Sequence, residues 1–270
     1  MSTHSAKRNL RDDVRVPDAK ADLYLVGLGI GGFDRRSVEA DEALRDCAVI
    51  LHLTAFDDEL RDRYSGQVVD LAEAYQASDD AIDVYARMTE IAFSYLERSA
   101  FLGPVAFVTY GHPLYLVDTG WQLRRYCSER GYRVKALIAP TFVDQALSDL
   151  GARFDVGYQC YEARFFYRWR VAIDTRMPLM LAEVGDFGTT RLRDTDRSAS
   201  RVAPLLDRLQ SAYPPERRCA LFLLPWRRDM APAVQWTVVR DLPALATSVH
   251  IASSLFIAGD ENLEYFDIDD

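Results

Sequence analysis

A short apolar segment that runs directly into glycines, LYLVGLGIGG over 23–32, constrains the fold of this chain more than any other feature. Its apolar residues predict a buried strand, and the glycines allow a tight turn because glycine has no Cβ to clash. A helical face with Ala40, Leu44 and Cys47 follows, and then a second apolar segment, CAVILHL. VAFVTY and RVKALI continue the alternation. The pattern predicts an α/β fold with a largely parallel sheet and ligand sites beyond the carboxyl ends of its strands.

The second half of the chain is richer in strands. QCYEARFFY, PLMLAEV, CALFLLP, VQWTVVR and SVHIASSLFIAG are predicted strands, and 198–213 is a predicted helix. We therefore expect two α/β subdomains, 22–138 and 139–258. A flexible polar arm over 1–21 precedes them and an acidic tail over 259–270 follows.

Charge and composition exclude several classes of partner. The chain has 270 residues, with 32 Lys and Arg against 41 Asp and Glu, a net charge of −9 that disfavours a nucleic-acid backbone. No apolar run approaches the ~20 residues of a membrane helix, and the start lacks a secretory apolar core, so we expect a cytoplasmic protein that does not contact membranes. The dispersed cysteines and histidines predict neither a disulfide scaffold nor a metal site.

The glycine loop, considered by itself, allows two interpretations. Gly27, Gly29 and Gly32 formally satisfy G-x-G-x-x-G after a strand, a pattern that binds dinucleotides. However, Phe33–Arg36 delays the following helix, and no acidic residue follows the second strand directly. The plainer alternative is a tight turn that binds nothing. A second loop, Tyr-Gly-His-Pro over 110–113, is predicted beside the first, and two such loops favour a pocket between them.

Taken together, LYLVGLGIGG, VAFVTYGHPLYL and ALIAPTFVDQALSDLG resemble in order and spacing the tetrapyrrole methylase superfamily of S-adenosylmethionine (SAM)-dependent methyltransferases, over about 22–258. Most of that superfamily has Gly-Asp-Pro where this chain has Tyr-Gly-His-Pro. The form here resembles the borosin-type enzymes, which methylate backbone amide nitrogens of a peptide. QCYEA, AEVG and LFLLP are similar to three further landmarks of that subfamily. The resemblance implies a SAM site in the cleft between the two subdomains.

The resemblance also implies which residues hold SAM, and S-adenosylhomocysteine as its product. These residues are Gly27, Gly29, Tyr110, Gly111, His112, Pro113, Tyr115, Thr141, Glu183, Phe222, Ser253 and Ser254. Relatives carry Ser at Thr141 and Gln at Glu183, so we expect Glu183 to contact the adenine amine. Without the resemblance, Thr141 equally well caps the helix over 143–150, and Ser253 and Ser254 are ordinary strand residues.

A peptide nitrogen is a poor nucleophile because its lone pair is delocalised into the carbonyl. In borosin-type enzymes a tyrosine pocket is implicated, and the residues that match it here are Tyr85, Tyr75 and Tyr110. A phenol has a pKa of about 10, and a nearby sulfonium favours phenolate, so we expect Tyr85 to act as the base while the others polarise the carbonyl. The alternative places Tyr85 in the core, on one helical face with Met88 and Tyr95, in a helix opened by Ser78-Asp79-Asp80.

The chain departs from the borosin pattern in two ways. Ala81 stands where relatives carry Arg, four residues before Tyr85, and Arg87 is a candidate replacement from the next turn. The chain also lacks the fused substrate tail, so we expect a separate precursor peptide, methylated in trans by a homodimer. Two alternatives stay open: methylation of a corrin, porphyrin or other small molecule, and a non-catalytic peptide-binding homologue.

Overall fold

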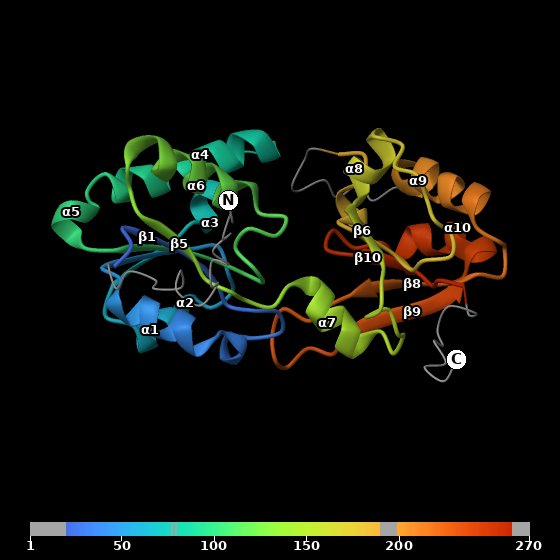
Figure 1. Cartoon of the computed structure of the whole chain (residues 1–270), viewed down its shortest axis with the longest axis horizontal. Coiled ribbons are helices and arrows are strands. Elements are labelled where there is room, and N and C mark those ends of the chain that lie inside the picture. The colour runs from blue at the N-terminus through green and yellow to red at the C-terminus, as the bar shows by residue number, and fades with distance from the viewer. Residues whose placement is uncertain (1–19, 77, 79, 190–198, 261–270) are drawn as a thin grey trace, which may run out of the picture.

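The computed structural model describes residues 20–76, 78, 80–189 and 199–260. Most of the expected arm and tail lies outside these residues. Two sheets, each covered by helices, form an N-terminal lobe that ends after the strand Val134–Ala136 and a C-terminal lobe that begins with the helix Phe142–Asp149 (Figure 1). In Figure 1 the N-terminal lobe is blue to green and the C-terminal lobe yellow to red, with the segment that carries α7 between them. The arrangement confirms the predicted α/β fold.

The first sheet is entirely parallel and has the order β3-β2-β4-β1-β5. Its strands are β1 (Leu23–Gly27), β2 (Val49–His52), β3 (Gln67–Asp70), β4 (Val105–Thr109) and β5 (Val134–Ala136). Alternate residues of β1 pack on opposite faces. Leu23 and Leu25 contact the cluster that includes Met88 and Leu123, and Tyr24 and Val26 contact the other cluster. Because both faces are buried, the central strands β1, β2 and β4 are almost entirely apolar, whereas the edge strands β3 and β5 carry exposed Gln67, Asp70 and Lys135.

Helices cover both faces of the first sheet. The helices are α1 (Val38–Asp46), α2 (Asp57–Arg63), α3 (Ala72–Gln76), α4 (Ala81–Leu96), α5 (Ser99–Leu102) and α6 (Asp118–Arg130). Buried residues of α3, α4 and α6 share one core cluster, and those of α1 and α2 share the other. Figure 1 shows these two groups above and below the sheet. None of the helices among the described residues is long and apolar enough to cross a membrane.

The second sheet is mixed, with the order β6-β7-β10-β8-β9 and one parallel pair, β6 with β7. Its strands are β6 (Gln159–Glu162), β7 (Leu179–Ala182), β8 (Arg218–Leu223), β9 (Ala233–Val238) and β10 (Ser254–Ile257). Its helices are α7 (Phe142–Asp149), α8 (Ala163–Arg168), α9 (Ala199–Ala212) and α10 (Leu242–Leu245). α7 packs on one face of the sheet, and α8, α9 and α10 pack on the other.

The structure corrects three local predictions. QCYEARFFY is a strand only as far as Glu162, whose carboxylate accepts hydrogen bonds from the amides of Arg164 (2.7 Å) and Phe165 (2.6 Å) and so starts α8. SVHIASSLFIAG is a strand only over β10. Asp80, not Ser78, is the N-cap of α4, because its carboxylate accepts from the amide of Ile82 at 2.8 Å. Asp79 lies outside the described residues.

The two predicted loops, after β1 and after β4, are joined to each other. The Gly111 amide donates to the Gly29 carbonyl at 3.0 Å, which forms an isolated antiparallel bridge. Beneath it, a Cβ added to Gly27 would lie 1.8 Å from the Gly111 carbonyl oxygen. Glycine at position 27 is therefore required by close backbone approach, and it fixes how the second loop sits on the first.

We expect Gly27→Ala to destabilise the protein by about 3 kcal/mol or more, because the added methyl clashes with backbone that cannot move freely. Urea unfolding measures the change. Gly131→Ala is the control: Gly131 has φ 75° and nothing within 4 Å of an added Cβ, so only the left-handed backbone costs stability, about 1–2 kcal/mol. Equal losses in the two variants would contradict the close approach.

Candidate functional site

Two adjoining cavities lie at the carboxyl ends of the first sheet's strands, in the cleft between the lobes. The first cavity, of about 490 Å³, is lined by Ile30, Tyr75, Tyr85, Tyr110, Gly111, His112, Tyr115, Leu116, Val117, Thr141, Phe142, Ala182, Glu183, Asp186, Ile251, Ala252 and Ser254. The second cavity, of about 480 Å³, is lined by Leu53, Tyr75, Tyr85, Met88, Phe107, Thr109, Tyr110, Leu116, Val117, Asp118, Thr119, Glu162, Arg164, Glu183 and Asp186. Both volumes are in the range of ligand pockets.

The two cavities share one wall, which we call the seam. It consists of Tyr75, Tyr85, Tyr110, Leu116, Val117, Glu183 and Asp186. The three tyrosines come from α3, α4 and the loop after β4, whereas the two carboxyl groups follow β7 in the other lobe. A group transferred from one cavity to the other would therefore pass hydroxyl and carboxyl groups on its way.

Seven of the residues predicted to hold a cofactor line the first cavity: Tyr110, Gly111, His112, Tyr115, Thr141, Glu183 and Ser254. The other five line neither cavity. Gly27 and Gly29 lie beneath the second loop, and Pro113 follows His112 in that loop. Phe222 is 1% exposed and packs in the core beside α7. Ser253 accepts a hydrogen bond from the His250 amide at 2.8 Å, so it holds the turn that leads to Ser254.

Burial holds two tyrosines of the seam, Tyr85 and Tyr110, in their phenol form. The pKa of Tyr85 is raised to about 12, chiefly by burial and then by Tyr75 and Glu183. Burial also raises the pKa of Tyr110, whose hydroxyl oxygen accepts a hydrogen bond from the Ala55 amide. The chain's own groups therefore oppose the predicted phenolate at Tyr85.

The predicted replacement of the family's arginine is also wrong. Arg87 is exposed on α4 and lines neither cavity. Arg164 is the one cation among the described residues that line the two cavities, and it is paired with Glu162 at 3.1 Å. Among the described residues, no unpaired guanidinium thus lines the cavities beside Tyr85. A tyrosine that keeps its proton at neutral pH acts as a hydrogen-bond donor.

Glu183 and Asp186 form a half-buried pair of acidic groups in the seam. The pKa of Glu183 is raised from 4.5 to about 7, first by burial and then by repulsion from Asp186 and Glu162, against the attraction of Arg164. Burial likewise raises the pKa of Asp186. Glu183 therefore exchanges a proton close to neutral pH, a property that suits a general acid or base.

Two residues of the seam have a strained backbone. Leu116 (φ 58°) and Glu183 (φ 57°) are two of the three non-glycine residues with positive φ in the described part of the chain. A left-handed conformation costs such residues about 1–3 kcal/mol and often marks a functional site. The surrounding structure imposes this geometry on both.

Thr109 has an unsatisfied hydroxyl at the second cavity. It ends β4, is 8% exposed, and its Oγ1 has no hydrogen-bond partner within the described residues. A buried hydroxyl without a partner is costly, so its site fits a ligand that carries a polar group. Sequence analysis missed Thr109, Asp186 and Arg164. The position of Thr109 at the carboxyl end of a parallel strand was the available signal.

The comparisons with known proteins agree with this architecture. The family model described as "Tetrapyrrole (Corrin/Porphyrin) Methylases" matches residues 22–222. The chain belongs to this family. No curated protein matches the chain. Tetrapyrrole methylases take the methyl group from SAM, and this protein is a SAM-dependent methyltransferase of that type.

Solved structures show the same fold. The uroporphyrin-III-C-methyltransferase of Thermus thermophilus matches with a TM-score of 0.60 and 21% identity, over 91% of this chain and 95% of its own. The methyltransferase CobJ matches with a TM-score of 0.61 and 16% identity, over 88% and 94%. Cobalt precorrin-4 methyltransferase, CbiF, matches with a TM-score of 0.58 and 15% identity, over 87% and 94%. These similarities confirm the predicted fold, and the family model confirms the predicted superfamily.

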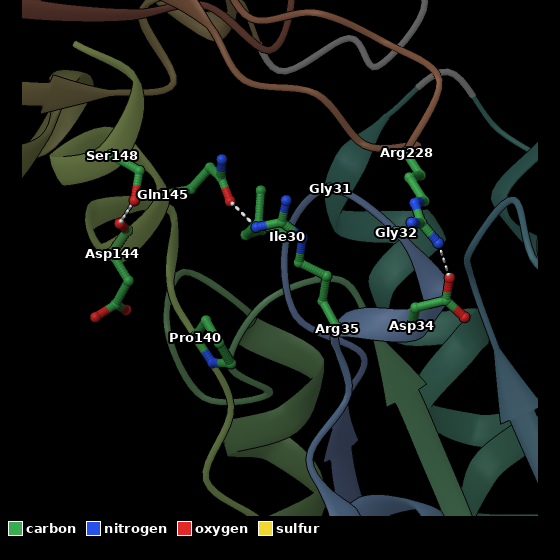
Figure 2. Close-up of a pocket in the computed structure, with 10 residues that line it drawn as sticks. All are labelled: Ile30, Gly31, Gly32, Asp34, Arg35, Pro140, Asp144, Gln145, Ser148 and Arg228. Carbon is green, nitrogen blue, oxygen red and sulfur yellow. Dashed lines mark hydrogen bonds and ion pairs between the residues drawn. The ribbon is translucent and has the colours of Figure 1, made fainter. Parts of the chain in front are cut away.

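A third cavity of this tetrapyrrole methylase lies between the glycine loop and α7 (Figure 2). Its volume is about 520 Å³. In it Arg35 donates to Gln145 at 3.0 Å, and Arg228 donates to Asp34 at 3.0 Å. Both contacts join the N-terminal lobe to the C-terminal lobe. This cavity therefore belongs to the junction that holds the lobes together.

The raised pKa of Glu183 gives a stability prediction for the methylase. Its pKa when folded exceeds that of the unfolded chain, so the carboxyl group destabilises the fold as pH rises from about 4.5 to 7. We expect Glu183→Gln to stabilise the protein by about 1–3 kcal/mol at about pH 8 and to change little at about pH 4. Denaturant unfolding at both pH values measures this, and a pH-independent difference would contradict it.

Proposed function

We propose that this methyltransferase methylates backbone amide nitrogens of a separate precursor peptide, as borosin-type enzymes do. SAM would occupy the first cavity and the peptide the second. The observation that carries the proposal is the seam, where Tyr75, Tyr85 and Tyr110 stand between the two cavities. The Tyr-Gly-His-Pro loop, which contributes Tyr110, supports it as well.

The first cavity suits a nucleoside with charged ends. Ile30, Tyr115 and Phe142 supply apolar surface, and His112 and Ser254 supply polar groups. In SAM the methyl group is bonded to a positively charged sulfur, and this sulfur is already a good leaving group. The protein therefore has to hold and orient both partners, and such alignment supplies several kcal/mol of barrier reduction.

Thr141 serves two purposes at the edge of this cavity. Its Oγ1 accepts from the Val143 amide at 3.2 Å and donates to the Asp144 carboxylate at 2.8 Å. The Asp144 carboxylate also accepts from the Thr141 backbone amide at 2.6 Å, which completes the capping box of α7. One lone pair of the hydroxyl stays available. Thr141 can thus accept one hydrogen bond from a ligand while it caps the helix.

The tyrosines of the seam provide what an amide acceptor needs. Hydroxyl donors aimed at the peptide carbonyl stabilise the negative charge that builds on its oxygen as the nitrogen loses its proton. Leu116 and Val117 limit access of water at the same wall. We take Tyr85 as the leading donor; Tyr110, whose oxygen accepts a hydrogen bond from the Ala55 amide, can still donate its own O–H.

The charge of the second cavity supports a peptide substrate over the main alternative. Corrin and porphyrin intermediates carry several carboxylate side chains, and the wall of this cavity carries Asp118, Glu183 and Asp186. Like charges would repel such a substrate. A peptide backbone is neutral and has no such conflict. The proposal includes a homodimer that encloses the peptide, a state that sedimentation of the purified protein would report.

The first test of the function combines binding and catalysis. Calorimetry should show SAM binding at micromolar concentrations, and incubation with the product of a short neighbouring open reading frame should add one methylene mass per transfer, located on backbone nitrogen. SAM binding and peptide binding without any mass gain would instead identify a non-catalytic homologue. Methyl groups on a corrin or porphyrin alone would favour the small-molecule alternative.

The second test removes the leading hydroxyl donor. Tyr85→Phe should lower kcat by about 100-fold while the Kd for SAM stays within about threefold, because the hydroxyl acts mainly in the transition state. Tyr95→Phe is the matched control, since Tyr95 lies on the same helix but lines neither cavity. Unchanged turnover in Tyr85→Phe would remove that residue from catalysis.

A further inference from the structure

The proposed reaction requires a group that takes the amide proton, and the tyrosines of the seam do not supply one. Tyr85 is partly buried beside Tyr75, Glu183 and Asp186, which raise its pKa after burial itself, so its phenol is held protonated. Burial raises the pKa of Tyr110 as well, against the hydrogen bond from the Ala55 amide, so its phenol also keeps its proton. The position of the family's arginine is Ala81, and the exposed Arg87 does not replace it. The proton acceptor has to be sought elsewhere in the seam.

Glu183 is placed where such an acceptor is needed. It lines both cavities, so it faces the donor side and the acceptor side of the seam. It directly follows β7, and its left-handed backbone (φ 57°, ψ 36°) sets the direction of its side chain. No hydrogen bond from another described residue reaches its carboxylate, so its oxygens are available to a substrate N–H.

The surroundings of Glu183 favour a carboxyl group that binds a proton near neutral pH. Burial is the largest cause of its raised pKa; Asp186 on the same turn, Glu162 at the end of β6 and Asp118 at the start of α6 raise it further, and Arg164 on α8 lowers it. Tyr75 and Tyr85, from α3 and α4, line the same two cavities. Burial and these charged neighbours together bring about the proton affinity that a general base requires at cellular pH.

We propose that Glu183, rather than a tyrosine, is the catalytic base that accepts the backbone amide proton, with Tyr85 as the hydrogen-bond donor to the adjacent carbonyl. The inference rests on the proposed function. It assigns to Glu183 a role different from the adenine contact that the family resemblance implies. The unpaired hydroxyl of Thr109 in the second cavity is a further polar contact for the peptide.

The step balances with the groups named. The amide N–H bond breaks and its proton moves to a carboxylate oxygen of Glu183. The nitrogen forms the bond to the methyl carbon, and the carbon–sulfur bond of SAM breaks with its electron pair left on sulfur. The products are the N-methylated amide, S-adenosylhomocysteine and a protonated Glu183, which returns its proton to solvent. No metal, oxidant or further reactant enters the step.

The test compares Glu183→Gln with three other variants, using the full chain, SAM and the precursor peptide. Glu183→Gln keeps the shape and the hydrogen-bonding capacity but cannot take the proton. We expect kcat to fall by about 100-fold or more and the acid limb of its pH profile to vanish. Asp186→Asn should move that limb to lower pH, because a like charge is removed. Tyr85→Phe should lower kcat but keep the limb.

Two further measurements separate this role from simple cofactor binding. Calorimetry should give Glu183→Gln a Kd for SAM within about threefold of the parent protein. Carbon NMR of the enzyme labelled at its glutamate carboxyl groups should show one group that titrates near neutral pH and disappears in Glu183→Gln. Glu129→Gln is the matched control, since Glu129 is 60% exposed on α6 and outside the site, and it should behave as the parent.

The possible results have distinct meanings. If the parent methylates the peptide and Glu183→Gln does so at the same rate with the same pH profile, the role of Glu183 is overturned and the proposed function stands. Loss of SAM binding in Glu183→Gln would make Glu183 a cofactor ligand and likewise overturn the inference. If the parent binds SAM but methylates no peptide amide, the proposed function fails, and the inference fails with it.

Discussion

The close approach of two backbones, at Gly27 and Gly111, is the constraint on which the rest of the site depends. With a Cβ at Gly27 excluded, the loop after β4 lies directly on the end of β1 and is bonded to it through Gly29 and Gly111. This fixes Tyr110, Gly111 and His112 at the edge of the cleft. The C-terminal lobe then completes the cavities with residues that follow β7 and precede β10. The site thus forms where two sheets, each ended by a tight turn, face each other.

Sequence patterns were sufficient for most of the fold. The apolar strands of the first sheet are buried on both faces, so their continuous apolar runs stood out, as did the glycine loop. Sequence patterns did not predict α8 and α2, where the pattern of apolar residues and the local helix signals point to different elements. The residues of α8 are as apolar and aromatic as a strand, and only the capping carboxylate of Glu162 shows where the strand stops. The charged α2 was missed because it buries chiefly one residue, Leu60.

The site could be predicted only in part. The family resemblance pointed to seven residues that line the first cavity, and to the three tyrosines of the seam. It could not show that the environment of Tyr85 is acidic, because Asp118, Glu162 and Asp186 are far from Tyr85 in sequence and come together only through the two lobes. Nor could it show that the Thr109 hydroxyl has no hydrogen-bond partner among the described residues, since the absence of a hydrogen bond cannot be read from a sequence.

The resemblance to borosin-type enzymes implies an arginine at the position of Ala81 and a glutamine at the position of Glu183, and electrostatics links these two differences. A guanidinium near Tyr85 would lower the pKa of the phenol and favour phenolate. Without it, and with carboxyl groups nearby, the phenol holds its proton more tightly, and the task of accepting a proton passes to the group with the lower pKa. Glu183 has that lower pKa. Its surroundings raise the pKa of Tyr85 to about 12 but that of the carboxyl group only to about 7. The strained backbone and buried charge at Glu183 both cost stability, a cost that a site performing proton transfer explains and a purely structural glutamate does not.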